Sequence, residues 1–248
     1  MSTLTSINDL NYNYLSNLIS NLLANKLYRC ETQMQFEIAW KIKEDLNSLH
    51  EWDVCLEYLS STSVCNNKTK RLYTDIIILN KSTGNFIPIE IKYKTKLYSH
   101  GGVEVLKNHG AQDLGSYDFL WDAKRVELLK SPFITIRDNN GNTITYTKEI
   151  TLTDFIRGFS IMITNDSTYY SGSHIGYAQN FYPIDDKCFS NGTSYNWVGR
   201  NPNIKSYFLN TWRDMPIEFD NNHNCNWSTS ISSPHPYSVN FKYLIFEI

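Results

Sequence analysis

The stretch YTDIIILNKSTGNFIPIEIKYK, residues 73–94, decides how this chain is expected to fold. Two apolar segments, 73–79 and 86–92, flank a run of turn-forming residues at 81–85. Apolar, β-branched segments on either side of such a turn predict an antiparallel hairpin. The charges within it are few: Asp75 on the first arm, and Glu90 and Lys92 on the second.

Alternation along the second arm separates its charges from its apolar side chains. The isoleucines at 87, 89 and 91 point to one face, and Glu90 and Lys92 share the other. If the two strands diverge at this end, Asp75 meets Glu90 and Lys92. Two close carboxylates repel each other unless a cation lies between them, and Mg²⁺, with its preference for oxygen ligands, suits that position. A half-solvated hairpin with an ordinary charged face is the alternative interpretation.

The rest of the chain predicts a mixed α/β (α+β) fold. Helices are expected over 6–26, from Cys30 or Glu31 to about 46, and over 112–129; the second would bury Phe36 and Trp40 among its apolar positions. Strands are expected at 54–58, 159–164 and 241–248, with a small hairpin at 134–150 around Asn140-Gly141. Segments 60–70, 95–102 and 165–235 are expected to be loops or loop-rich.

Composition excludes two classes of protein. Hydrophobic residues make up 41% of the 248 and aromatic residues 14%, which is far from the composition of a disordered chain. The formal net charge of −2 argues against a generally basic nucleic-acid binder, although a local basic groove is compatible with it.

Five scattered cysteines without a CxxC pair favour a reducing, cytoplasmic compartment. No segment has the pattern of a signal peptide or the roughly 20 apolar residues of a membrane span, so no membrane association is expected.

The spacing from Asp75 to Glu90-Ile91-Lys92, with apolar strands around both acids, resembles the PD-(D/E)xK, or restriction-endonuclease-like, nuclease superfamily. Thr74 stands where the proline of the family name would be. The segments CETQMQFEIAW, IEIKYKTK and HGAQDLGSYDFLWDAKRVE also look like a group of uncharacterised bacterial members. The resemblance implies a nuclease core over 1–165, with a central mixed sheet flanked by helices. Residues 166–248 would then form a loop-rich, β-containing elaboration packed on the same domain.

By this resemblance, Asp75 and Glu90 ligate Mg²⁺, for which Mn²⁺ can substitute, and Lys92 positions or activates the attacking water. Glu31 opens the second helix where many members add a glutamate ligand, although an acid in a first helical turn is also favoured by the helix dipole. Glu57 is a candidate for the metal's outer shell.

Substrate contacts are expected from further residues. Lys94, with Lys96, Lys68, Lys70 and Arg71, would line a phosphate track, or these are ordinary solvated charges. Gln112 and Tyr117 resemble the Gln and Tyr of RecB-like members, at a spacing one residue longer. His109 and Asp113 stand at helical i, i+4 spacing, which favours a cap or surface contact over a metal site. Trp197, Trp212 and Trp227 are expected in a core or interface rather than stacked on bases.

The implied function is Mg²⁺-dependent hydrolysis of DNA in bacterial restriction, phage defence or repair. Two alternatives remain. One is a non-catalytic member that binds DNA or protein, and the other is an effector that is active only with a partner. A homodimer would suit double-strand cleavage.

Overall fold

The computed structural model describes residues 4–138, 141–172, 176–198, 213 and 215–248. The first half contains the 3-10 turn η1 (Ile7–Asp9), helices α1 (Tyr12–Asn25) and α2 (Glu31–Asp45), and strands β1 (Trp52–Cys65), β2 (Lys68–Asn80), β3 (Phe86–Lys94), β4 (Tyr98–His100) and β5 (Val103–Leu106). Then follow α3 (Gln112–Leu128), β6 (Phe133–Arg137), β7 (Thr143–Lys148), β8 (Phe159–Thr164) and the turn η2 (Ser167–Tyr169). The two-residue strands are β9 (Cys188–Phe189), β10 (Ser194–Tyr195), β11 (Ile217–Glu218), β12 (His223–Asn224) and β13 (Ile231–Ser232), and β14 (Asn240–Glu247) ends the chain.

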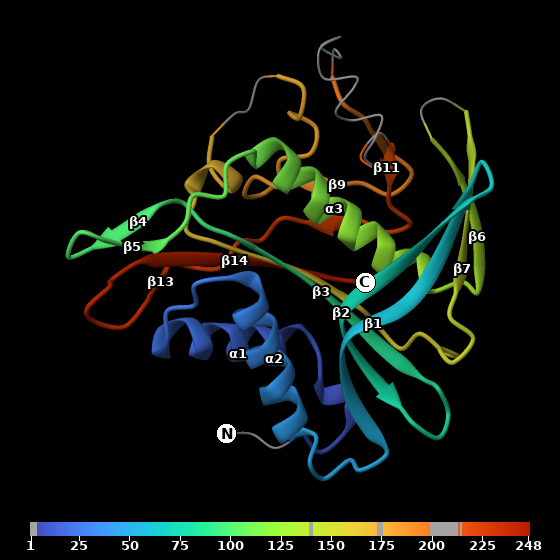
Figure 1. Ribbon diagram of the computed structural model, residues 1–248, viewed down its shortest axis with the longest axis horizontal. Coiled ribbons are helices and arrows are strands. Elements are labelled where there is room, and N and C mark those ends of the chain that lie inside the picture. The colour runs from blue at the N-terminus through green and yellow to red at the C-terminus, as the bar shows by residue number, and fades with distance from the viewer. Residues whose placement is uncertain (1–3, 139–140, 173–175, 199–212, 214) are drawn as a thin grey trace.

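A central mixed sheet organises the molecule, in the order β13-β14-β8-β3-β2-β1-β7-β6 (Figure 1). Strands β2 and β3 pair antiparallel, whereas β3 and β8 pair parallel across the connection that contains α3. The fold is therefore α+β with a large mixed sheet flanked by helices, as the sequence predicted at this level.

The two faces of the sheet carry different cores. Helices α1 and α2 cover one face (Figure 1), where alternate residues of β2, β3, β8 and β14 form a mainly aliphatic cluster that includes Ile76, Ile89 and Ile161. Helix α3 covers the other face, where Phe119 and Phe246 belong to a cluster rich in aromatic residues. The predicted alternation on β3 is confirmed, because its odd-numbered residues face α1 and α2.

Strands β1 and β2 extend much further than expected. The prediction of a polar loop over 60–70 is wrong, because both strands continue through this segment and are joined by Asn66 and Asn67. These two asparagines have φ angles of 47° and 61°, the left-handed conformation of a two-residue hairpin turn. Segment 95–102 likewise contains β4, which pairs with β5 around Gly101 and Gly102.

Helix α2 buries most of the stripe predicted for it, but not its two aromatic residues. Met34, Ile38 and Ile42, four residues apart, face the core, whereas Phe36 is 51% exposed and Trp40 is 53% exposed. Two residues correspond to roughly 200° of helical rotation, which carries Phe36 and Trp40 to the solvent side. There the two rings stack at 6.1 Å between centroids.

The C-terminal third packs on α3 through its aromatic side chains. Trp227 is buried, and Trp197 stacks on Tyr117 of α3 at 5.3 Å, so both have the predicted core role; Trp212 lies outside the described residues. Strand β14 pairs with β8 and so completes the sheet. Among the described residues, no helix is long and apolar enough to cross a membrane.

Candidate active site

The site begins where β2 and β3 separate. Their ladder ends at the pair Ile76 and Ile89, one residue before Asp75 and Glu90 would face each other. Beyond that point Asp75 Oδ2 accepts a hydrogen bond of 2.6 Å from Ile91 N, and Glu31 Oε2 accepts one of 2.8 Å from Tyr93 N. Carboxylates thus satisfy backbone donors that lack a partner strand, which brings Glu31 and Asp75 to β3.

Helix α2 fixes the opposite side of this gap. Gln35, four residues after Glu31 and therefore on the same helix face, donates 2.8 Å to Asp75 O and 3.0 Å to Glu57 Oε1. Glu57 has a φ of 47° within β1, so the strand is locally irregular beside Asp75. Gln35 was missed from the sequence, although its i, i+4 spacing from Glu31 was a signal for it.

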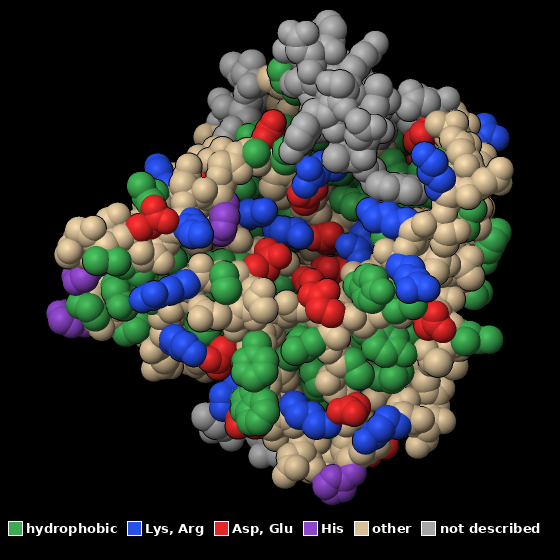
Figure 2. Space-filling view, in the orientation of Figure 1, with side chains coloured by type: hydrophobic (Ala, Val, Ile, Leu, Met, Phe, Trp, Pro, Cys, Tyr) green, Lys and Arg blue, Asp and Glu red, His purple; other side chains and the backbone are tan. Residues whose placement is uncertain are grey.

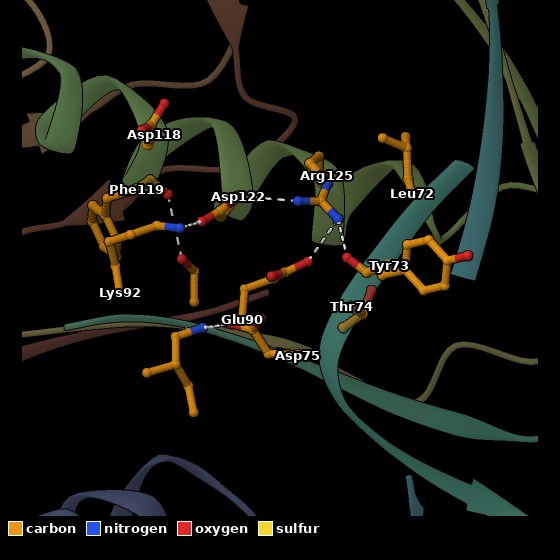
Figure 3. Close-up of polar contacts among 12 residues, drawn as sticks. Leu72, Tyr73, Thr74, Asp75, Glu90, Lys92, Asp118, Phe119, Asp122 and Arg125 are labelled. Atoms are coloured by element: carbon orange, nitrogen blue, oxygen red, sulfur yellow. Dashed lines mark hydrogen bonds and ion pairs between the residues drawn. The ribbon is translucent and has the colours of Figure 1, made fainter. Parts of the chain in front are cut away.

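Helix α3 supplies the other half of the site (Figure 3). Lys92 Nζ lies 2.8 Å from Asp122 Oδ2, and Arg125 Nη2 lies 3.1 Å from Glu90 Oε1. Arg125 Nη1 also donates 3.2 Å to Asp122 Oδ1. We call Asp75, Glu90, Lys92, Asp122 and Arg125 the split-strand cluster. Asp122 and Arg125 were missed from the sequence.

Crowding and burial disfavour ionisation of both strand acids. Desolvation, followed by the charge of Asp122, raises the pKa of Asp75 to about 7, even though the Ile91 N–H favours the carboxylate. Burial also raises the pKa of Glu90 well above its usual range; Asp122 and Asp75 add to the rise, and Arg125 counters it. A cation near these two carboxylates would lower their free energy.

Lys92 has the opposite balance. Burial of its ammonium opposes ionisation, but Asp122 and Glu31 outweigh this and raise the pKa of Lys92. The lysine is therefore held as a cation. In this geometry it stabilises negative charge rather than accepting a proton.

The donor set fits a hard divalent cation bound through few protein ligands. Glu90 Oε1 and Asp122 Oδ2 are buried and accept no hydrogen bond of acceptable geometry from the described residues, despite their ion-pair contacts with Arg125 and Lys92. No group of three or more Asp, Glu, His or Cys side chains in the described part of the chain is arranged to hold a metal. Mg²⁺ is commonly held by one or two carboxylates plus waters and substrate phosphates, which suits Asp75 and Glu90. Glu31 is committed to Tyr93 N through one oxygen.

Basic side chains surround the acids. Figure 2 shows acidic side chains gathered in a hollow on this face, with lysines and arginines around them. Lys94 lies two residues after Lys92 on β3, and burial and the charge of Lys92 lower the pKa of Lys94. Burial, Arg125 and Arg213 lower the pKa of Lys70 on the β1–β2 hairpin. Cations close enough to disfavour one another form a surface that an anion would stabilise.

Other predicted residues lie elsewhere. Tyr117 is fully buried and its hydroxyl donates 3.1 Å to Met215 O, so it contacts the C-terminal region. Gln112 donates 3.0 Å to Asp166 Oδ2. His109 precedes α3, which begins at Gln112, so its expected i, i+4 relation to Asp113 does not form; its Nδ1 accepts 3.1 Å from Thr95 N.

Comparison with known proteins adds no relative: no family model, curated protein or solved structure matches this chain. The site must therefore be interpreted from its own geometry.

Proposed function

We propose that this protein is a Mg²⁺-dependent nuclease that hydrolyses phosphodiester bonds in DNA, with a restriction-endonuclease-like core. The observation that supports it best is the convergence of Asp75, Glu90 and Lys92 where β2 and β3 separate (Figure 3), with the buried Glu90 Oε1 accepting no well-oriented hydrogen bond from any described residue. One fold serves many functions, so this proposal rests on the site and not on the sheet.

Each residue has a distinct task in this proposal. Asp75 and Glu90 would hold the cation, which when bound lowers the pKa of a water ligand and polarises the phosphate. Lys92 remains charged and stabilises the negative charge that develops on the phosphate oxygens. Asp122 orients the Lys92 ammonium through its 2.8 Å contact. Lys94 and Lys70 would attract the nucleic-acid backbone.

Cleavage of two substrates tests the proposal. Supercoiled plasmid and circular single-stranded DNA are incubated with the wild-type protein in Mg²⁺, Mn²⁺ or EDTA. The variants Asp75→Ala and Lys92→Ala are assayed in the same way. We expect metal-dependent cleavage that falls by about 100-fold or more in both variants, a loss of roughly 3 kcal/mol in transition-state stabilisation. Asp53→Ala is the matched control, because Asp53, near the start of β1, is an aspartate already paired with Lys43 of α2. Cleavage that survives both variants would refute the assignment.

A non-catalytic scaffold that binds DNA or a protein is the second candidate. It is favoured by the ion pairs that already engage both Glu90 and Lys92 with α3. It predicts DNA or protein binding that is unchanged by EDTA and by Lys92→Ala, with no cleavage of either substrate.

A further inference from the structure

Arg125 joins three elements at the mouth of the gap between β2 and β3. Its guanidinium lies 3.1 Å from Glu90 Oε1 on β3 and 3.2 Å from Asp122 Oδ1 on α3, and it also donates to Tyr73 O on β2. The side chain is 19% exposed, so it is mostly enclosed but still reaches solvent. Arg125 therefore contacts the acid that is most buried in the cluster.

The contact between Arg125 and Glu90 is an incomplete pair. One guanidinium nitrogen faces Glu90 Oε1, and that oxygen receives no hydrogen bond of acceptable geometry from the described residues. Asp118, about two turns before Arg125 on α3, shows what a complete pair looks like: Arg213 Nε donates 2.7 Å to its Oδ1, and Arg213 Nη2 donates 2.7 Å to its Oδ2. Two-point pairs of this kind are the strong and specific ones. The ion pair between Arg125 and Glu90 is therefore weaker than the two-point pair between Arg213 and Asp118.

The surroundings of Arg125 attract anions. Figure 2 shows lysines and arginines around the acidic hollow. Lys70, Arg125 and Arg213 form one group, in which Arg213 is paired with Asp118; Lys92 and Lys94, two residues apart on β3, form a second, in which Lys92 is paired with Asp122. Burial makes the repulsion within each group more costly, and a phosphate group placed among them would relieve it.

We propose that a divalent cation bound at Asp75 and Glu90 competes with Arg125 for Glu90, and that the displaced guanidinium contacts the phosphate of the bound nucleic acid. The phosphate contact rests on the proposed nuclease function; the competition does not. Arg125 then acts as a positioning residue for Glu90 in one arrangement and as a substrate contact in the other. Asp122 keeps Lys92 in place in both, because its other oxygen is the one that contacts Arg125.

Binding of Mn²⁺ to the full chain, measured by calorimetry without DNA, tests the competition. Arg125→Gln removes the charge and is expected to tighten Mn²⁺ binding roughly tenfold, since a unit charge within a few ångströms of the cation site is lost. Arg125→Lys, which keeps the charge, is expected to stay near wild type, and Glu90→Gln to lose binding. Arg137→Gln on β6 is the control, because Arg137 is exposed and far along the sheet.

DNA binding with Ca²⁺ in place of Mg²⁺ tests the phosphate contact. Arg125→Gln is expected to weaken binding and to reduce the slope of log K against log salt by about one, the change expected for one lost phosphate contact. In EDTA, where Arg125 stays with Glu90, the same variant is expected to bind DNA as the wild type does.

The outcomes separate this proposal from the nuclease assignment. If Arg125→Gln binds Mn²⁺ more tightly than the wild type, and the wild type cuts no DNA, the competition is upheld and the nuclease assignment is rejected. Unchanged or weaker Mn²⁺ binding by a folded Arg125→Gln, or no Mn²⁺ binding by the wild type, would overturn it. If Arg125→Gln does not fold, the ¹⁵N-labelled wild type decides: Mg²⁺ is expected to shift the Arg125 Nε–Hε resonance, and an unmoved resonance would overturn the competition.

Discussion

Helix α3 carries two buried charge clusters that are built in different ways. The first joins Lys124 and Glu127 to Asp220 and His223 of the C-terminal region. Glu127 Oε1 contacts His223 Nε2 at 3.1 Å, and Oε2 accepts 3.1 Å from Asp220 N and 3.2 Å from Lys124 Nζ. Both oxygens of this carboxylate are satisfied, and we call this group the C-terminal cluster.

The second is the split-strand cluster, to which α3 contributes Asp122 and Arg125 from the side that faces the sheet. The carboxylates of this cluster are incompletely hydrogen-bonded. Glu90 Oε1 and Asp122 Oδ2 have a cation within 3.1 Å and 2.8 Å, but neither accepts a well-oriented hydrogen bond from the described residues. Burial alone is similar in the two clusters, since Glu90 and Glu127 are both almost fully enclosed.

The difference between the clusters is therefore one of hydrogen bonding. A buried carboxylate whose two oxygens both accept hydrogen bonds is stabilised within the fold and has less capacity left for a ligand. One with an unsatisfied oxygen costs folding free energy and retains that capacity. Helix α3 thus combines a structural cluster with a cluster suited to binding.

The largest effect is expected at the C-terminal cluster. Glu127→Ala leaves Lys124 and His223 buried without their shared acid, and we expect it to lower the free energy of unfolding by about 3–5 kcal/mol. Urea denaturation measures this, with Glu104→Ala on the exposed part of β5 as control. A loss below about 1 kcal/mol would remove the distinction between the clusters.

A pH series in EDTA is expected to give opposite signs for the two clusters. The folded pKa of Asp75 is raised to about 7, so the native state holds a proton that the unfolded chain has released, and stability falls as pH rises from about 4 to 7. Asp75→Asn should remove the part of this slope that Asp75 contributes, at most about 1.4 kcal/mol per pH unit, and leave the part of the same sign that the raised pKa of Glu90 contributes.

Glu127 behaves in the reverse manner. Burial opposes its ionisation, but the bonds from His223, Asp220 N and Lys124 outweigh burial and lower the pKa of Glu127. The stability that Glu127 contributes is fully present above the pKa of glutamate in the unfolded chain, near 4. It is lost as the pH falls through the lower pKa of Glu127 in the folded protein. Unfolding free energies of wild type, Asp75→Asn and Glu127→Ala between pH 3 and 8 test both signs; parallel profiles would contradict the comparison.

Local patterns predicted most of the fold but not how far its strands extend. Helices α2 and α3 and strands β3, β8 and β14 follow from periodicity near their predicted bounds. The helix predicted over 6–26 is instead divided into the 3-10 turn η1 and α1, which begins only at Tyr12. The β1–β2 extension was missed because Ser, Thr, Asn and Lys suit both loops and solvated strands, and pairing with β7 decides between them. Phe36 and Trp40 were misplaced because apolar character alone does not fix which side of a helix is buried.

The sequence predicted the site residues that lie on strands. It did not predict those on α3, because which side of a helix faces the sheet is not fixed by local pattern. Strand alternation places Glu90 and Lys92 on one face whatever surrounds them, and a hairpin brings Asp75 near them. Asp122 and Arg125 reach the same point only because α3 packs on β3 and β8 with that side inward, which tertiary packing sets. Their signal in the sequence was charge on a helix that is otherwise buried: Asp122, Lys124, Arg125 and Glu127.

The smallest effect on stability is expected at Glu90. Its raised pKa means that the buried, ionised form is disfavoured, and a glutamine side chain at this position would fill the same space without a charge. We expect Glu90→Gln to change the free energy of unfolding by less than about 1 kcal/mol, in either direction, because Arg125 retains Asp122 and Tyr73 O. Glu127→Gln, the matched change in the C-terminal cluster, should cost more, since a charged partner of Lys124 is lost.

The test measures two quantities for Glu90→Gln and for Glu127→Gln: the free energy of unfolding in urea and the affinity for Mn²⁺. Glu90→Gln is expected to lose cation binding while keeping its stability, and Glu127→Gln to lose stability while keeping cation binding. A stability loss at Glu90 as large as that at Glu127 would mean that the ion pair with Arg125 is a structural bond. In that case the unsatisfied oxygen of Glu90 would no longer indicate a binding site, because removing the carboxylate would cost the fold as much as removing a fully bonded one.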